Sequence, residues 1–192
     1  MRSEPGHRTI VPCGIVVALT MWACRGEPEL PATLIDHDQW RVVGPADDPF
    51  SHRPPDTSCP TSSWSPELQG LGLALEVDTT FCGYCSLWQP TLAAFPAGHE
   101  LELTWGHGAL TAAAPGVEGH FAVLLGDRTL VDEWLPIPLD AEDRVVTVEI
   151  PEAVPEGTRV LLHLHNHGDN TWYLSDIAPP RPATTAASSD SL

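Results

Sequence analysis

Short apolar segments separated by turn residues fill the central part of this chain and constrain its fold more than any other feature. Most of them alternate apolar and polar residues, which is the two-residue period of a half-buried β-strand. Gly, Pro and Asp separate the segments at spacings typical of a sandwich, and no window shows the 3.6-residue period of a long helix. A short turn near residues 65–68 is the one helix-like candidate. The sequence therefore predicts an all-β fold, a single antiparallel β-sandwich over residues 58–178. Its expected strands include residues 71–77, 101–105, 121–125, 130–135, 145–150, 160–165 and 171–174.

The segments on either side of this domain differ from it in composition. Residues 24–57 are rich in Pro, Asp, Glu and Arg and show little periodicity, which favours an extended tether. Residues 179–192 are of low complexity and are expected to form a disordered tail. One folded domain with two flexible flanks follows from this division.

The N-terminus has the pattern of a secretory signal peptide over residues 1–23. Arg2 and Arg8 precede an apolar run that ends at Ala23 and is too short to span a membrane as a helix. The segment Met21–Cys24 resembles the lipobox of bacterial lipoproteins. That resemblance implies lipidation of Cys24 and attachment to a membrane of the cell envelope. In similar lipoproteins of enteric bacteria, an Asp directly after the lipidated cysteine retains the protein at the inner membrane. Here Arg25 stands at that position, so the resemblance favours the outer membrane, on its periplasmic or surface face.

The net charge of −17 and the absence of lysine narrow the range of partners. An acidic surface repels phosphate backbones, so nucleic acid is not an expected partner. The same charge opposes polybasic contact with anionic lipids, so a membrane link would depend on acyl chains.

Three cysteines lie inside the expected domain: Cys59, Cys82 and Cys85. An oxidising compartment favours a disulfide, and we expect Cys59 to pair with Cys82 or with Cys85. The C-x-x-C motif formed by Cys82 and Cys85 is not followed by a helix start, because Pro90 comes soon after it. A thioredoxin-like redox role is therefore not expected.

The strand at 160–165 carries the main concentration of chemically active groups. Strand side chains alternate between faces, so His163, His165 and His167 share one face, opposite Val160, Leu162 and Leu164. Two histidines at i and i+2 can bind one ion, and His107 and His120 could join them. Neutral imidazoles suit Zn²⁺ or Cu²⁺, the only cofactors that the sequence suggests. The alternative is structural, with each ring hydrogen-bonded to a neighbour on a polar sheet face.

Residues 157–174 resemble the strand–turn–strand unit of cupredoxin-like domains. Those domains have an apolar strand, an Asn-x-Gly turn and then a His ligand before the next strand. Here Asn166 and Gly168 match the turn, Trp172 stands where the ligand is expected, and no Met or Cys follows Cys85. The resemblance implies a jelly-roll or cupredoxin-like sandwich rather than copper electron transfer.

Aromatic and amide residues near the end of the domain suggest a binding function. Trp172 and Tyr173 point to opposite faces, so one of them is expected to be accessible near His165, with Asn166 and Asn170 as hydrogen-bonding neighbours. Trp105 shares a face with leucines and is expected in the core. No catalytic motif is present, so an enzyme is not expected. The sequence thus favours a lipid-anchored, non-catalytic module that binds carbohydrate or protein, with metal binding as the alternative.

Overall fold

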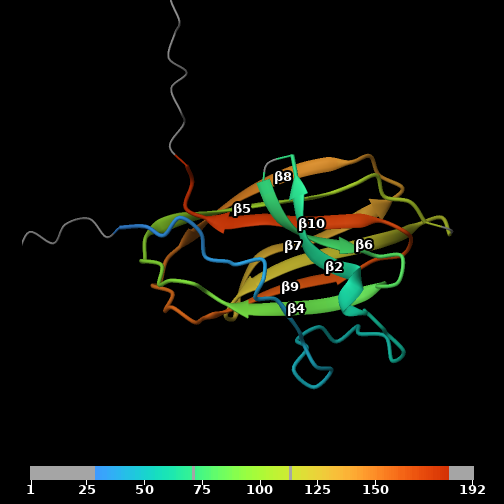
Figure 1. Cartoon of the computed structure of the whole chain (residues 1–192), viewed down its shortest axis with the longest axis horizontal. Helices are drawn as coiled ribbons and strands as arrows, with labels where there is room; N and C mark the ends of the chain where they lie inside the picture. The colour runs from blue at the N-terminus through green and yellow to red at the C-terminus, as the bar shows by residue number, and fades with distance from the viewer. Residues whose placement is uncertain (1–28, 71, 113, 182–192) are drawn as a thin grey trace, which may run out of the picture.

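The computed structural model describes residues 29–181 except residues 71 and 113. This part of the chain forms ten antiparallel strands in two sheets that pack face to face, as Figure 1 shows, and its only helical turn is η1 (Thr61–Ser63). The predicted all-β sandwich is confirmed. The strands are β1 (Arg41–Val42), β2 (Trp64–Gln69), β3 (Gly72–Asp78), β4 (Tyr84–Pro90), β5 (His99–His107), β6 (Val117–Leu125), β7 (Arg128–Ile137), β8 (Glu142–Ile150), β9 (Arg159–His165) and β10 (Thr171–Ala178).

The first sheet has the strand order β1-β4-β9-β6-β7, and the second has the order β2-β3-β10-β5-β8. β9 therefore lies at the centre of the first sheet, between β4 and β6. Residues 65–68, expected as a helix-like turn, belong instead to β2, where Pro66 faces β3. Proline is accepted there because β2 is an edge strand, which has one side without ladder hydrogen bonds.

The core lies between the two sheets. Val160, Leu162 and Leu164 point into it from β9 and are at most 1% exposed. Trp105 from the second sheet stacks on Phe121 from the first, with ring centroids 4.2 Å apart and planes 6° apart. The predicted core position of Trp105 is confirmed. Because the even-numbered positions of β9 face the core, His163 and His165 must face outward from the first sheet.

Residues 29–57 pack against the sandwich, which differs from the extended tether expected over 24–57. Leu34, Ile35, Trp40 and Val43 are buried, and β1 extends the first sheet by pairing with β4. The Leu34 N–H donates to the Ile177 carbonyl at 2.8 Å, which fixes the segment to β10. These apolar side chains cover the edge and one end of the sandwich, so they follow no regular period that the sequence could show.

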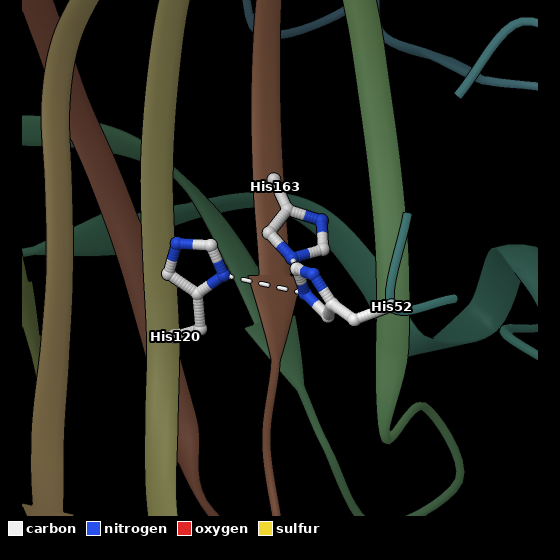
Figure 2. A group of neighbouring side chains, drawn as sticks. All are labelled: His52, His120 and His163. Carbon is white, nitrogen blue, oxygen red and sulfur yellow. Dashed lines mark hydrogen bonds between the residues drawn. The ribbon is translucent and has the colours of Figure 1, made fainter. Parts of the chain in front are cut away.

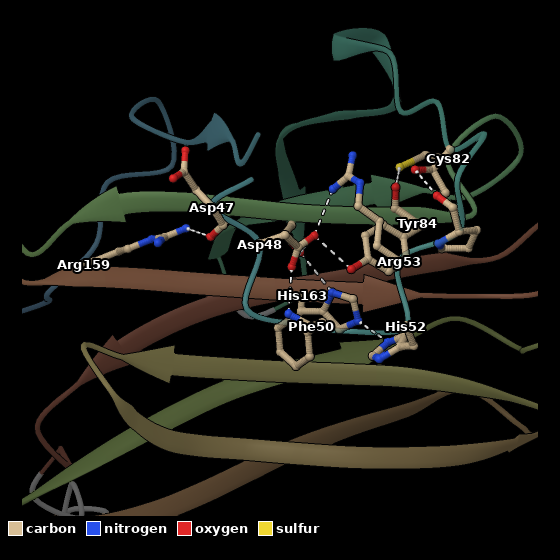
Figure 3. Close-up of polar contacts among 12 residues, drawn as sticks. Asp47, Asp48, Phe50, His52, Arg53, Cys82, Tyr84, Arg159 and His163 are labelled. Carbon is tan, nitrogen blue, oxygen red and sulfur yellow. Dashed lines mark hydrogen bonds and ion pairs between the residues drawn. The ribbon is translucent and has the colours of Figure 1, made fainter. Parts of the chain in front are cut away.

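The next part of this segment, residues 44–58, crosses the outer face of the first sheet and is called the strap below. Its side chains contact β4 and β9, as Figure 3 shows. At its end, Cys59 forms a disulfide with Cys82, which confirms one of the two expected pairings. Cys85 is a free, buried thiol.

No helix among the described residues is long and apolar enough to cross a membrane. The expected signal peptide over 1–23, the lipidation site at Cys24 and nearly all of the expected tail over 179–192 lie outside the described residues.

Candidate metal centre

Three histidines from distant parts of the sequence meet on the outer face of the first sheet. His163 is in β9 and His120 is in the neighbouring strand β6, where it lies diagonally across the ladder from His163. His52 comes from the strap, and its ring lies over β9 next to His163 and faces the ring of His120, as Figure 2 shows. We call His52, His120 and His163 the histidine cluster.

The ring nitrogens of the cluster are separated by the distances expected of ligands that share one ion. His52 Nε2 lies 3.1 Å from His163 Nε2 and 3.4 Å from His120 Nδ1. The three candidate donor atoms all lie within 4.8 Å of one another. A tetrahedral zinc site with Zn–N bonds of 2.0–2.1 Å places its nitrogens about 3.3 Å apart. The rings therefore need little movement to close around a cation.

Hydrogen bonds on the far sides of the two sheet histidines determine which nitrogens carry protons. Ser86 Oγ donates to the Asp48 carboxylate at 3.2 Å, so it accepts from His163 Nδ1, which lies 3.1 Å away. His120 Nε2 donates to Asp132 Oδ1 at 2.7 Å. Both rings are thus left with a lone pair that faces His52. Metal-bound histidines commonly have such a carboxylate or hydroxyl partner on the other ring nitrogen.

Asp48 fixes the strap above the sheet. Its carboxylate accepts hydrogen bonds from Tyr84 Oη and Arg53 Nη1, each at 2.9 Å, as well as from Ser86 (Figure 3). The Asp48 side chain is only 1% exposed, and Arg53 supplies the compensating charge. Burial and the Asp48 carboxylate both raise the pKa of Tyr84, which keeps its hydroxyl protonated as a donor. His52, four residues after Asp48, is therefore held in place.

Aromatic rings confine the cluster on two further sides. Phe50 stacks on His163 with ring centroids 3.8 Å apart, and Trp134 stacks on His120 at 4.1 Å. As a result His163 is fully buried and His120 is 3% exposed. Stacking restricts the rotation of both imidazoles, so the donor atoms are preorganised.

Burial also keeps two of these rings, His163 and His52, neutral. Desolvation, followed by the neighbouring histidines, lowers the pKa of His163 from about 6.5 to about 2. Desolvation likewise lowers the pKa of His52. Neutral imidazole is the form that coordinates metals, so His52 and His163 need not release a net proton at pH 7.

Two of the histidines predicted from the sequence lie beside the cluster. The half-buried ring of His165 stacks against His52 with centroids 5.4 Å apart. The exposed His167 follows, 4.7 Å from His165. His107 lies elsewhere: it is buried in β5 of the second sheet beside Trp172, and its Nδ1 contacts the Gly108 carbonyl at 2.8 Å. Because β5 belongs to the other sheet, His107 does not join the nitrogens that meet around His163.

The residues that were expected to bind a ligand instead pack in the core or stabilise the fold through hydrogen bonds. Trp172 is 1% exposed and belongs to the core, so its ring offers no surface for stacking. Tyr173 lies on the opposite sheet from His165 and donates to Asp143. Asn166 and Asn170 are buried and anchor the turn after β9 through Thr79 and Thr111. Amide side chains in such a turn satisfy backbone groups rather than a ligand.

The sequence did not indicate His52, because it lies in a segment that was expected to be a tether. The available signal was local: Phe50 and His52 interrupt an otherwise polar, proline-rich stretch. An aromatic residue and a histidine that both need partners favour contact with a folded surface.

No protein-family model matches this chain, and no curated protein is significantly similar to it. Solved structures include several remote likenesses. TmCBM61 in complex with β-1,4-galactotriose is 15% identical, covers 77% of this chain and 91% of its own, and has a TM-score of 0.42. A family 16 carbohydrate-binding module is 16% identical, with coverages of 62% and 86% and a TM-score of 0.38. The CBM22-1–GH10 modules of Clostridium thermocellum Xyn10B, complexed with xylohexaose, are 10% identical, with coverages of 83% and 30% and a TM-score of 0.43. Likenesses this remote do not indicate a ligand.

Proposed function

We propose that this protein binds a transition-metal ion, Zn²⁺ or Cu²⁺, through His52, His120 and His163. The observation that carries the proposal is the convergence of three imidazole nitrogens, two of them with lone pairs directed at the third. One proton on His52 Nε2 can be donated fully to only one of its two neighbours. A cation satisfies all three nitrogens at once.

The donor set favours these ions over others. Imidazole suits zinc and copper, whereas Ca²⁺ and Mg²⁺ require oxygen ligands. Three histidines leave a fourth position for water or another ligand. Asp132, bonded to His120, and Asp48, linked to His163 through Ser86, increase the electron density on the donor nitrogens and offset part of the charge of the ion.

Metal binding should stabilise the fold, because the ligands come together only in the folded chain. His52 and His163 are 111 residues apart in sequence, so the unfolded chain has no preformed site. A ligand at a hundredfold excess over its Kd adds about 2.7 kcal/mol to the free energy of unfolding. Thermal unfolding of the protein with Zn²⁺, with Cu²⁺ and with chelator measures this gain.

Variants of the histidine cluster test whether its three residues cause the stabilisation by metal. His120→Ala and His163→Phe each remove one of three ligands, and we expect affinity to fall by more than about 100-fold, the upper limit seen when only an outer partner is lost. His99→Ala, in the second sheet, is the matched control and should bind as the wild type does. If chelator and metal give the same unfolding curve for the wild type, the proposal is wrong.

A second candidate function is that of a non-catalytic module which binds carbohydrate or protein. Trp134, on the same face as the cluster, is 50% exposed, and a flat exposed indole is suited to stacking on a sugar ring. A glycan array probed with the wild type and with Trp134→Ala tests this function: binding that the variant loses supports it. In this second candidate function, lipid on Cys24 attaches the module to the membrane.

A further inference from the structure

The histidine cluster is closed on most sides, which raises the question of how an ion reaches it. The strands β6 and β9 form its floor, Phe50 covers His163, and Trp134 covers His120. Tyr84 borders it as well, with its ring centroid 4.9 Å from His163. An ion in solution therefore has no direct contact with the two buried ligands.

One side of the cluster is bordered by further imidazoles. His167 is exposed, His165 is half-buried, and His52 is partly buried next to the buried His163. Successive ring centroids along this row are 4.7, 5.4 and 5.1 Å apart. The row thus runs from solvent to the cluster, with each ring in contact with the next.

We propose that His165 and His167 form a loading site that captures Zn²⁺ or Cu²⁺ at the surface and passes it to the histidine cluster through His52. This inference rests on the proposed metal-binding function. In the transfer, each imidazole nitrogen that the ion gains replaces a bound water or a previous imidazole. The ion exchanges its ligands one at a time, so it is never stripped of all of them inside the protein. No oxidant, reductant or proton donor is needed.

A loading site has a kinetic signature that differs from that of a ligand. If His165 and His167 act only during transfer, removing them slows uptake and release by the same factor and leaves the Kd unchanged. If they are ligands of the bound ion, removing them raises the Kd. Uptake that has to wait for the strap to open would be slower by at least about tenfold.

The test is stopped-flow mixing of the metal-free protein with Zn²⁺ or Cu²⁺, and of the loaded protein with excess chelator. The variants are His165→Phe combined with His167→Ala, and His99→Ala as the control. Phenylalanine keeps a ring stacked on His52 while removing the donor nitrogens, so the variant tests coordination rather than packing. We expect both rates to fall at least about tenfold in the double variant and neither to change in the control.

Two results would overturn the inference. Unchanged uptake and release rates in the double variant would mean that ions reach the cluster by another route. Faster uptake in Asp48→Asn would then identify opening of the strap as that route. A raised Kd with an unchanged uptake rate would make the pair part of the binding site. If the wild type binds neither metal, it is the proposed function that fails, and this outcome is distinct from both.

Discussion

The Asp48 carboxylate joins the strap to the sheet through donors from three residues. Tyr84 and Ser86 lie in β4, whereas Arg53 lies in the strap itself. A buried carboxylate is tolerated when its hydrogen bonds are satisfied and its charge is paired. If the carboxylate is removed, each of its donors is left without an acceptor. The position of His52 therefore depends on a residue that does not contact the ion.

We expect Asp48→Ala to destabilise the metal-free protein by about 3 kcal/mol, because the partly buried Arg53 and two hydroxyls lose their acceptor. The affinity of this variant for metal should also be lower, because His52 loses its support. Asp47→Ala, at the neighbouring exposed position, should change stability by less than about 0.5 kcal/mol. Urea unfolding in the presence of chelator measures both, and equal effects of the two changes would contradict the role of Asp48.

The lowered pKa of His163 makes the metal-free fold sensitive to acid. Between its unfolded pKa of about 6.5 and its folded pKa of about 2, the unfolded chain binds a proton that the folded chain does not. Stability is therefore complete above pH 6.5 and falls as the pH decreases, by about 1.4 kcal/mol per pH unit for this one group. His165, whose pKa is lowered to about 4, acts in the same direction.

Unfolding measured with chelator between pH 7.5 and pH 5 tests this dependence. His163→Phe keeps a ring against Phe50 and should make the curve less steep over that range, leaving the contribution of His165. A variant that is as sensitive to acid as the wild type would show that other groups are responsible.

At the scale of elements, the strap is held at both ends by different means. Asp48 fixes its beginning to β4, and the disulfide between Cys59 and Cys82 fixes its end to the loop before β4. The two bonds together restrict the position of His52 between them. Cys85, which comes three residues after Cys82, is buried inside the sandwich.

We expect the disulfide to contribute about 3 kcal/mol to stability, since it closes a loop with a sequence separation of 23 residues. Burial raises the pKa of Cys85 to about 12, so its thiol should resist alkylation in the native protein. Peptide mapping by mass spectrometry should find Cys85 labelled only after denaturation. Native labelling of Cys59 or Cys82 without reductant would contradict the observed pairing.

The sequence predicted the elements that have a regular period and missed those that do not. The strands at 101–105, 121–125 and 160–165 show alternation or a continuous apolar run, because each has one or both faces buried along its length. The segment with Leu34, Trp40 and Val43 packs irregularly over an edge, so its apolar residues have no period. His163 and His165 could be placed on one face, but the pairing of β6 beside β9 depends on tertiary contacts between distant segments.

At the scale of the whole molecule, the predicted lipid anchor determines where the metal centre would operate. We expect Cys24→Ser to yield an unlipidated protein that no longer fractionates with membranes. Mass spectrometry of the mature N-terminus and membrane fractionation check this. If the wild type carries no lipid and both proteins fractionate alike, the resemblance to lipoproteins is misleading.

The acidic charge of the chain also affects cation binding at this scale. A net charge of −17 raises the local concentration of divalent ions around the molecule and attracts them more strongly at low ionic strength. We therefore expect metal uptake to slow as salt is added, while the buried coordination bonds change little.

The packing of the N-terminal segment would shorten the distance between the predicted anchor at Cys24 and the folded domain. Leu30 already contacts the core, and it lies only six residues after Cys24. Six fully extended residues reach about 20 Å, whereas the whole of residues 24–57 would have reached several times farther. A protein anchored at Cys24 would therefore carry its folded domain, and the proposed metal centre in it, beside the bilayer rather than at the end of a long tether.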